Sequence, residues 1–175
     1  MINASNGVDV GELLTNLVEI LVSGLSDDVA TARYAASIGA RTFFKNHATS
    51  IYGAMLVPAV SLNRFYAAEG VRSTNLETWK TLTSIDPENY LEAITLFCTD
   101  QIAKGDGSSK EAACLCLDDI CSKFVSDHLK AIFSNLVDKI LHALKTCFDD
   151  ESWTVRDSAI AACSTIVDSY PSESV

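Results

Sequence analysis

The sequence predicts an all-α fold, a right-handed α-α superhelix (solenoid) of about four stacked helical hairpins. Three observations lead to this prediction. Helix breakers are few, with 8 Gly and 3 Pro among 175 residues, which favours long helices over a fold of many turns. Apolar residues recur at the i, i+3 and i+4 spacing of amphipathic helices. The same two-helix pattern returns along the chain, as it does in proteins whose stacked repeats share one core.

The last unit, about residues 128–170, shows the pattern most clearly. A first amphipathic helix ends at the acidic turn 149–152, and a second begins near Val155. A shift of 123 residues brings the first unit, about residues 11–46, into register with it. The apolar positions of the first helix that match in the first unit are Leu13, Leu14, Leu17, Val18, Leu21 and Leu25. Both units are therefore expected to be hairpins with a short acidic turn.

The two middle units, about residues 50–85 and 88–124, follow the pattern less closely. Tyr66 and Lys104 stand where the first and last units have an Asp in the turn. Residues 105–109 read Gly-Asp-Gly-Ser-Ser, which predicts a longer and more flexible connection than in the other units. Small residues in the second helices should let these helices approach one another closely.

A basic residue opens the second helix of every unit. These residues are spaced by 39, 38 and 46 positions and are Arg33, Arg72, Lys110 and Arg156. In the first and last units this residue follows an Asp by six positions, which resembles the turn of HEAT repeats, a family with periods of roughly 40 to 47 residues. Pro58 is similar to the proline that kinks the first helix of such repeats. The resemblance implies a single HEAT-like domain over residues 1–175, with a polar tail at 171–175.

Both terminal units keep apolar residues where a solenoid normally carries a polar cap. In the first unit these include Leu13 and Leu17, and in the last unit Ile160 and Val167. The chain is therefore either complete or part of a longer repeat array, and the sequence leaves both open.

Charge and cysteine usage exclude several classes of function. The net charge of −10 argues against nucleic acid as a partner, because a phosphate backbone requires a clustered cationic surface. No signal peptide and no apolar run of the roughly 20 residues of a membrane span is present, so no membrane association is expected. The six cysteines form no C-x-x-C pair and fall among apolar helical residues, which predicts free buried thiols and a cytoplasmic location.

The sequence shows no catalytic or cofactor-binding constellation. His47, His128 and His142 lie in separate units and lack the partners of a metal ligand set. No G-x-S-x-G elbow occurs, and Gly105-x-Gly107 lacks the context of a phosphate loop. HEAT-like hydroxylases hold two irons with His-Glu pairs, and no His-Glu dipeptide is present here. We therefore expect no metal and no cofactor, and this enzyme class ranks third among the possible functions.

One segment of the second unit combines aromatic residues with arginines, the residue types enriched in interface hot spots. It supplies the candidate partner-binding residues Arg64, Phe65, Tyr66 and Arg72, and Trp79 follows it. The alternative is that Phe65 and Tyr66 pack at the end of a long first helix and that Thr74-x-x-Glu77 caps the next.

Trp153 is the fifth candidate, in the turn of the last unit. It is either a lid over the hairpin core, which we favour, or an exposed anchor, as in the tubulin-binding HEAT arrays called TOG domains. The acidic turns of this chain have the wrong sign for acidic tubulin. Residues 86–175 carry a net charge of −9, either a solvated face or a dock for a basic segment.

Taken together, these patterns predict a non-enzymatic scaffold or adaptor that binds a protein or peptide through the concave or edge surface of the solenoid. The resemblance implies that the second helices line the concave side, where basic residues such as Arg33 and Arg156 alternate with acidic ones. The alternative is a cytoskeletal or ciliary module, of the TOG-like or dynein-assembly kind.

Overall fold

The computed structural model describes residues 10–47, 50–82, 87–123 and 127–171, with the backbone alone for 87–88 and 127–133. These residues form eight α-helices and one 3₁₀ helix, and no strand occurs among them. The elements are α1 (Val10–Leu25), α2 (Ala30–His47), α3 (Ile51–Asn63), α4 (Glu69–Leu82), η1 (Pro87–Tyr90), α5 (Leu91–Lys104), α6 (Gly107–Lys123), α7 (Asp127–Thr146) and α8 (Trp153–Ser169). The prediction of an all-α solenoid is confirmed.

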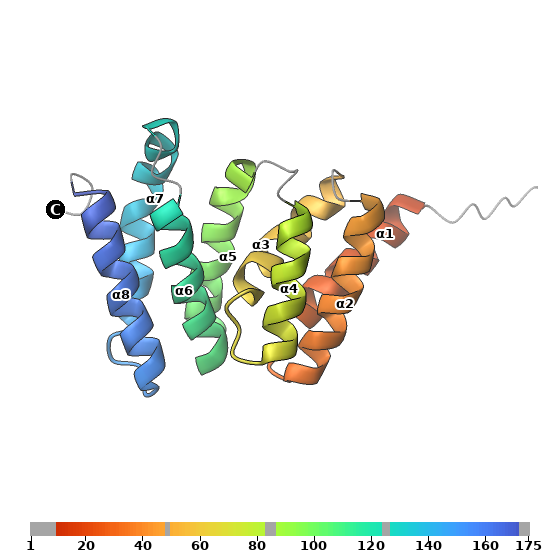
Figure 1. The fold of residues 1–175 in the computed structure, drawn as a ribbon, viewed down its shortest axis with the longest axis horizontal. Coiled ribbons are helices and arrows are strands. Elements are labelled where there is room, and N and C mark those ends of the chain that lie inside the picture. Colours follow the sequence, from red (N-terminus) through yellow and green to blue (C-terminus); the bar gives the residue numbers. More distant parts are fainter. Residues whose placement is uncertain (1–9, 48–49, 83–86, 124–126, 172–175) are drawn as a thin grey trace, which may run out of the picture.

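Consecutive helices pack in pairs, and the pairs stand side by side along the long axis of the molecule (Figure 1). The first helices of the pairs, α1, α3, α5 and α7, contact one another in turn. The second helices contact one another from α2 to α4 and again from α6 to α8. The apolar core runs between these two layers from Val18 in α1 to Ile166 in α8. Each pair thus buries its faces against its neighbours, as the repeat pattern requires.

Short polar side chains begin several of the helices by accepting backbone N–H groups that have no partner within the helix. Asp27 Oδ1 accepts from the Val29 amide at 2.7 Å before α2, and Ser50 Oγ accepts from the Gly53 amide at 3.1 Å before α3. Asp106 Oδ1 accepts from the Ser109 amide at 2.8 Å in the first turn of α6. The connection between α5 and α6 is therefore only Gly105 and Asp106, and the expectation of a longer loop over residues 105–109 is wrong.

Close packing between helices relies on small residues, as expected. α6 and α8 share the most extensive contact between helices, and four alanines of these helices are fully buried. These alanines are Ala112, Ala113, Ala159 and Ala162. In the first pair, a Cβ atom on Gly24 would lie 2.8 Å from the Cβ of Ala36, so only glycine allows α1 and α2 to approach this closely.

The row of second helices is interrupted in the middle of the molecule. Helix α4 does not pack extensively on α6, and α6 contacts α3 instead. We refer to this place as the α4–α6 boundary. Pro58 lies inside α3 and is buried. In the part of the chain that the structure describes, no helix is both long and apolar enough to cross a membrane.

Candidate protein-interaction site

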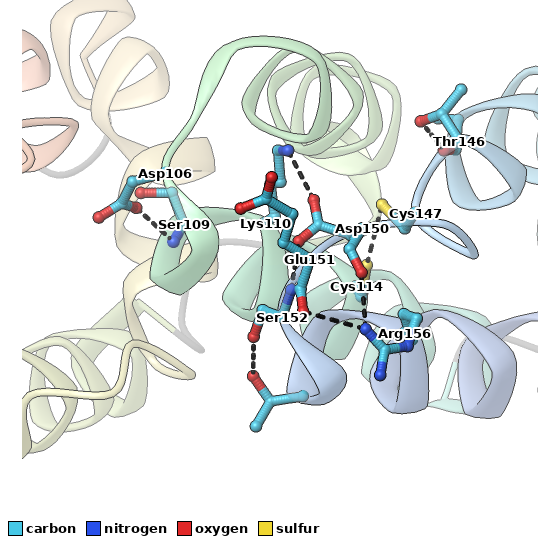
Figure 2. Close-up of polar contacts among 12 residues, drawn as sticks. Asp106, Ser109, Lys110, Cys114, Thr146, Cys147, Asp150, Glu151, Ser152 and Arg156 are labelled. Atoms are coloured by element: carbon cyan, nitrogen blue, oxygen red, sulfur yellow. Dashed lines mark hydrogen bonds and ion pairs between the residues drawn. The ribbon is translucent and has the colours of Figure 1, made fainter.

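In three of the four units the basic residue that opens the second helix bonds the turn of its own hairpin. Arg33 Nε donates to the Asp27 carbonyl at 2.9 Å, and Arg156 Nη1 donates to the Asp150 carbonyl at 2.7 Å. Arg72 Nη1 makes the equivalent contact with the Tyr66 carbonyl at 3.4 Å. The six-residue spacing of the motif therefore reflects an arginine that folds back onto the turn of its own hairpin, as Figure 2 shows for Arg156.

Arg33 is fully buried, so it does not line a partner-binding groove as its place in a second helix suggested. Its Nη1 donates to Asn63 Oδ1 at 3.0 Å, and its Nη2 donates to Ser109 Oγ at 2.8 Å. The guanidinium also stacks on the Tyr66 ring, 4.0 Å from the ring centroid. One side chain of the first unit thus connects the second and third units, because the planar guanidinium donates in several directions at once.

A second set of contacts joins neighbouring units at equivalent positions. In the third unit Lys110 Nζ lies 2.7 Å from Asp150 Oδ2 of the fourth unit (Figure 2). This hydrogen bond lowers the pKa of Asp150 and raises the pKa of Lys110. Arg33 and Tyr66 occupy the same two positions at the boundary between the first and second units.

The residues at the same two positions give a reason why α4 and α6 do not stack. At this boundary the two positions are held by Arg72 and Lys104. Two cations would repel each other if α4 packed on α6 in the way that α6 packs on α8. They form ion pairs within their own units instead, Arg72 with Glu69 and Lys104 with Asp100. Stacking of α4 on α6 is therefore disfavoured by charge.

Arg64 is buried at this boundary, with 7% of its surface exposed, and has the most contacts of the candidate residues. Its Nη1 lies 3.2 Å from Asp119 Oδ2 on α6, and its other nitrogens donate to the carbonyl and hydroxyl of Ser61. The guanidinium stacks on Trp79 at 4.1 Å and on Phe65 at 4.9 Å, measured to the ring centroids. Arg64 therefore joins α3, α4 and α6, and it presents almost no surface to a partner.

The structure divides the candidate residues of the second unit into buried and accessible ones. Tyr66 is buried beneath Arg33, whereas Phe65 and Arg72 are only partly buried. Half of the alternative for this segment holds, because Phe65 and Tyr66 pack against the core just after α3 ends at Asn63. The other half is wrong, because Thr74 lies inside α4 and does not cap its start. The segment is thus a turn whose first and third residues are fixed in the core.

Two residues that the sequence analysis did not select complete the surface of this boundary. Trp79 is half-buried beside Arg64, and Leu76 lies three residues earlier on α4, 41% exposed. Residues three apart share one face of a helix. Leu76 occupies the position of Ser37 and Cys114 in the first and third units, and both of those are fully buried against the next unit. Leu76 is accessible because α4 has no close neighbour on this side.

Trp153 lies far from this surface, at the start of α8, and its side chain is 68% exposed. The prediction that it covers the hairpin core is wrong. The first residue of each other second helix, Ala30, Glu69 and Gly107, is exposed as well. This position points away from the core in every unit, so the aromatic ring has no core to cover.

The thiols pack as apolar side chains. All six cysteines are free, and the prediction that they are buried holds for all but Cys163, which is partly buried. Cys114 Sγ lies 4.0 Å from Cys147 Sγ between the third and fourth units (Figure 2). Burial raises the pKa of Cys121 to about 12, so this thiol stays protonated at neutral pH.

No catalytic arrangement is evident where side chains are described. Within those residues, no three His, Cys, Asp or Glu side chains converge on a point that could hold a metal ion. A shallow hollow of about 450 Å³ lies between α5 and α7, with Asp100, Lys139 and His142 at its wall. Asp100 is already paired with Lys104 at 2.5 Å. The side chain of His128 lies outside the described residues.

Comparison with known families identifies one segment of the chain. Residues 140–170, which include the α7–α8 turn and the whole of α8, match the family described as HEAT repeat. No curated protein matches the chain. The matched segment contains Asp150 and Arg156, whose contact in the turn recurs in the first unit between Asp27 and Arg33. Residues 140–170 are therefore similar to a HEAT repeat, and the other units of the chain share its architecture of stacked helical hairpins.

Proposed function

We propose that this chain is a non-enzymatic scaffold that binds a protein partner at the α4–α6 boundary, through Phe65, Leu76, Trp79 and Arg72. HEAT repeats are typical of interaction scaffolds, and the free thiols support a cytoplasmic location, where they stay reduced. The observation that carries the proposal is the exposure of Leu76 at a position that is fully buried in the first and third units.

This surface suits a partner that offers both apolar and polar side chains. Leucine, tryptophan and phenylalanine supply apolar area, and the Trp79 ring is held by the stacked Arg64. Aromatic anchors that are rigid before binding lose little conformational entropy when a partner arrives. Asp119 and Lys123, which form an ion pair on α6, provide polar groups beside this area. The arrangement is that of an apolar centre with a polar edge.

The test is affinity capture from cell lysate with the Leu76→Glu variant beside the unmodified chain. A charge at an exposed position leaves the fold intact and opposes burial of this surface by a partner. The matched control is Met55→Glu, since Met55 is equally an exposed apolar residue, on α3. The expected result is a partner lost with Leu76→Glu and retained with Met55→Glu. A partner retained equally by both variants would contradict the proposed surface.

The exposure of Trp153 is the observation that favours the TOG-like alternative. Binding to acidic tubulin would require basic turns along the same edge. The turns instead hold Asp27, Asp106 and Asp150, and only Asp150 forms an ion pair with a basic side chain among the described residues. We therefore propose the α4–α6 boundary, and not the Trp153 turn, as the partner-binding surface.

A further inference from the structure

Both ends of the solenoid expose faces whose equivalents are buried where neighbouring units stack. Ile160 on α8 corresponds by the repeat register to Ser37 in the first unit and Cys114 in the third. Ser37 Oγ accepts from Asn75 of the following unit at 2.8 Å, and Cys114 lies against Cys147 of the following unit. Among the described residues no further hairpin packs on this side of α8, and the Ile160 side chain is 54% exposed.

The opposite end has the complementary face. Leu13 and Leu17 on α1 correspond to Leu136 and Ile140 on α7. The two α7 residues are buried, with 9% and 0% of their surface exposed, where α7 packs on α5 of the preceding unit. The two α1 residues are exposed by 54% and 43%. The first unit therefore presents the face that a preceding unit covers elsewhere in the molecule.

The charges on these two end faces also match. Lys110 of one internal unit pairs with Asp150 of the next, and the equivalent residues of the last and first units are Arg156 and Asp27. Asp27 uses Oδ1 to accept from the Val29 amide, as Asp150 uses Oδ1 for the Ser152 amide while Oδ2 contacts Lys110. Arg33 shows that the arginine can bond its own turn and stack on the next unit at once.

A second polar pair follows the same register. Glu111 Oε2 on α6 accepts from Thr154 Oγ1 on α8 at 2.9 Å. The equivalent residues at the two ends are Asp157 and Thr31, and both are exposed. A carboxylate on the last unit therefore corresponds to a hydroxyl donor on the first.

From these matched faces we infer that a second copy of this chain stacks head-to-tail, with α7 of one copy against α1 of the next and α8 against α2. This junction differs from the α4–α6 boundary in the charges at the two equivalent positions. Those positions hold Arg156 and Asp27 in the junction, but two cations, Arg72 and Lys104, at the α4–α6 boundary. In the junction Arg156 meets Asp27, and Ile160 lies against the small Ala36. Such an interface joins two different faces, so it continues from copy to copy instead of closing as a symmetric dimer.

The test measures the mass of the full chain in solution by analytical ultracentrifugation over a wide range of protein concentration. The unmodified chain is expected to form dimers and then longer species as concentration rises. Ile160→Glu and Leu17→Glu each place a charge in one of the two apolar faces, and each alone should weaken association more than about tenfold. Met55→Glu, on neither face, should associate like the unmodified chain.

Mixing the two variants distinguishes a head-to-tail contact from other modes of association. The Ile160→Glu chain keeps its first-unit face and the Leu17→Glu chain keeps its last-unit face, so the mixture should form one-to-one dimers and nothing larger. A symmetric contact between two α8 helices would instead let the Leu17→Glu chain dimerise by itself, and mixing in the Ile160→Glu chain would add no association. That result would overturn the proposal, as would an unmodified chain that stays monomeric, which would leave both faces to a different helical hairpin.

A gain of association provides a test that does not depend on loss of folding. Thr31→Lys places an ammonium opposite Asp157 of the neighbouring copy, and one exposed ion pair should strengthen association by about two- to fivefold at low salt. No change, or weaker association, would contradict the assigned register. Circular dichroism of each variant confirms that it is folded.

Discussion

Arg33 shows how one side chain can set the arrangement of several repeats. It bonds the turn of its own hairpin, the amide oxygen of Asn63 in the second unit and the hydroxyl of Ser109 in the third. Burial lowers the pKa of Arg33, and nearby Asp106 and Asp28 oppose this effect. A buried cation is tolerated here because its donors are met by oxygens and its face by the Tyr66 ring.

We expect Arg33→Lys to lower the free energy of unfolding by at least about 2 kcal/mol, because an ammonium cannot reach all three acceptors. Urea unfolding followed by circular dichroism measures this change. Arg156→Lys is the matched control, since Arg156 bonds only the carbonyls of its own turn and is half-buried. Its cost should stay below about 1 kcal/mol. Equal losses in both variants would refute the special role of Arg33.

The Asp150 carboxylate should make the free energy of unfolding depend on pH. The hydrogen bond from Lys110 lowers the pKa of Asp150 in the folded state. The stabilisation is therefore complete above the pKa that Asp150 has in the unfolded chain, and it is lost as the pH falls through the lower pKa that Asp150 has in the folded chain. The difference in unfolding free energy between the unmodified chain and Asp150→Asn should therefore shrink as pH falls from about 5 toward 3. A difference that is constant across this range would show that the Asp150 charge contributes nothing.

The connection between α5 and α6 leaves no room for a side chain at Gly105. A Cβ atom on Gly105 would lie 2.6 Å from the carbonyl oxygen of Gln101 and 2.8 Å from the Cβ of Ser109. Both are too close for any real side chain, and a backbone oxygen cannot move aside easily. Because Gly105 has no side chain, the chain can turn tightly here, and Asp106 caps α6 only two residues after α5 ends.

Gly105→Ala should consequently destabilise the protein by about 1–3 kcal/mol, a typical cost of forced overpacking. Gly107→Ala is the control in the same segment, because the nearest atom to its Cβ would be 3.9 Å away. That variant should lose no stability, since alanine favours helix over glycine. Thermal unfolding of both proteins side by side makes the comparison, and the reverse order of stabilities would contradict the geometry.

Across the whole molecule, the repeat register accounts for both the stacked and the unstacked boundaries. Where the two equivalent positions hold Arg33 and Tyr66, or Lys110 and Asp150, the second helices pack. Where they hold Arg72 and Lys104, α4 does not pack extensively on α6. A solenoid is quasi-one-dimensional, so one such pair changes the local stacking without disrupting the rest.

The fold could be predicted from the sequence because apolar spacing and the six-residue motif are local signals. The candidate site could be predicted only in part, because burial is decided by contacts between units. Arg64 and Tyr66 look like interface residues in the sequence, yet Asp119, 55 residues from Arg64, and Arg33, 33 residues before Tyr66, hold them in the core. The exposure of Leu76 depends on the missing contact between α4 and α6, because the equivalent Ser37 and Cys114 are buried where their units stack.

Hydrogen–deuterium exchange of the free and partner-bound chain shows whether a protein partner covers the α4–α6 boundary. Exchange is expected to slow on binding in peptides that cover residues 65–79, with the amides of α1 and α8 unchanged at a concentration where the chain does not self-associate. Protection confined to α1, α8 or the Trp153 turn, with residues 65–79 unchanged, would rule out the α4–α6 boundary as the binding surface.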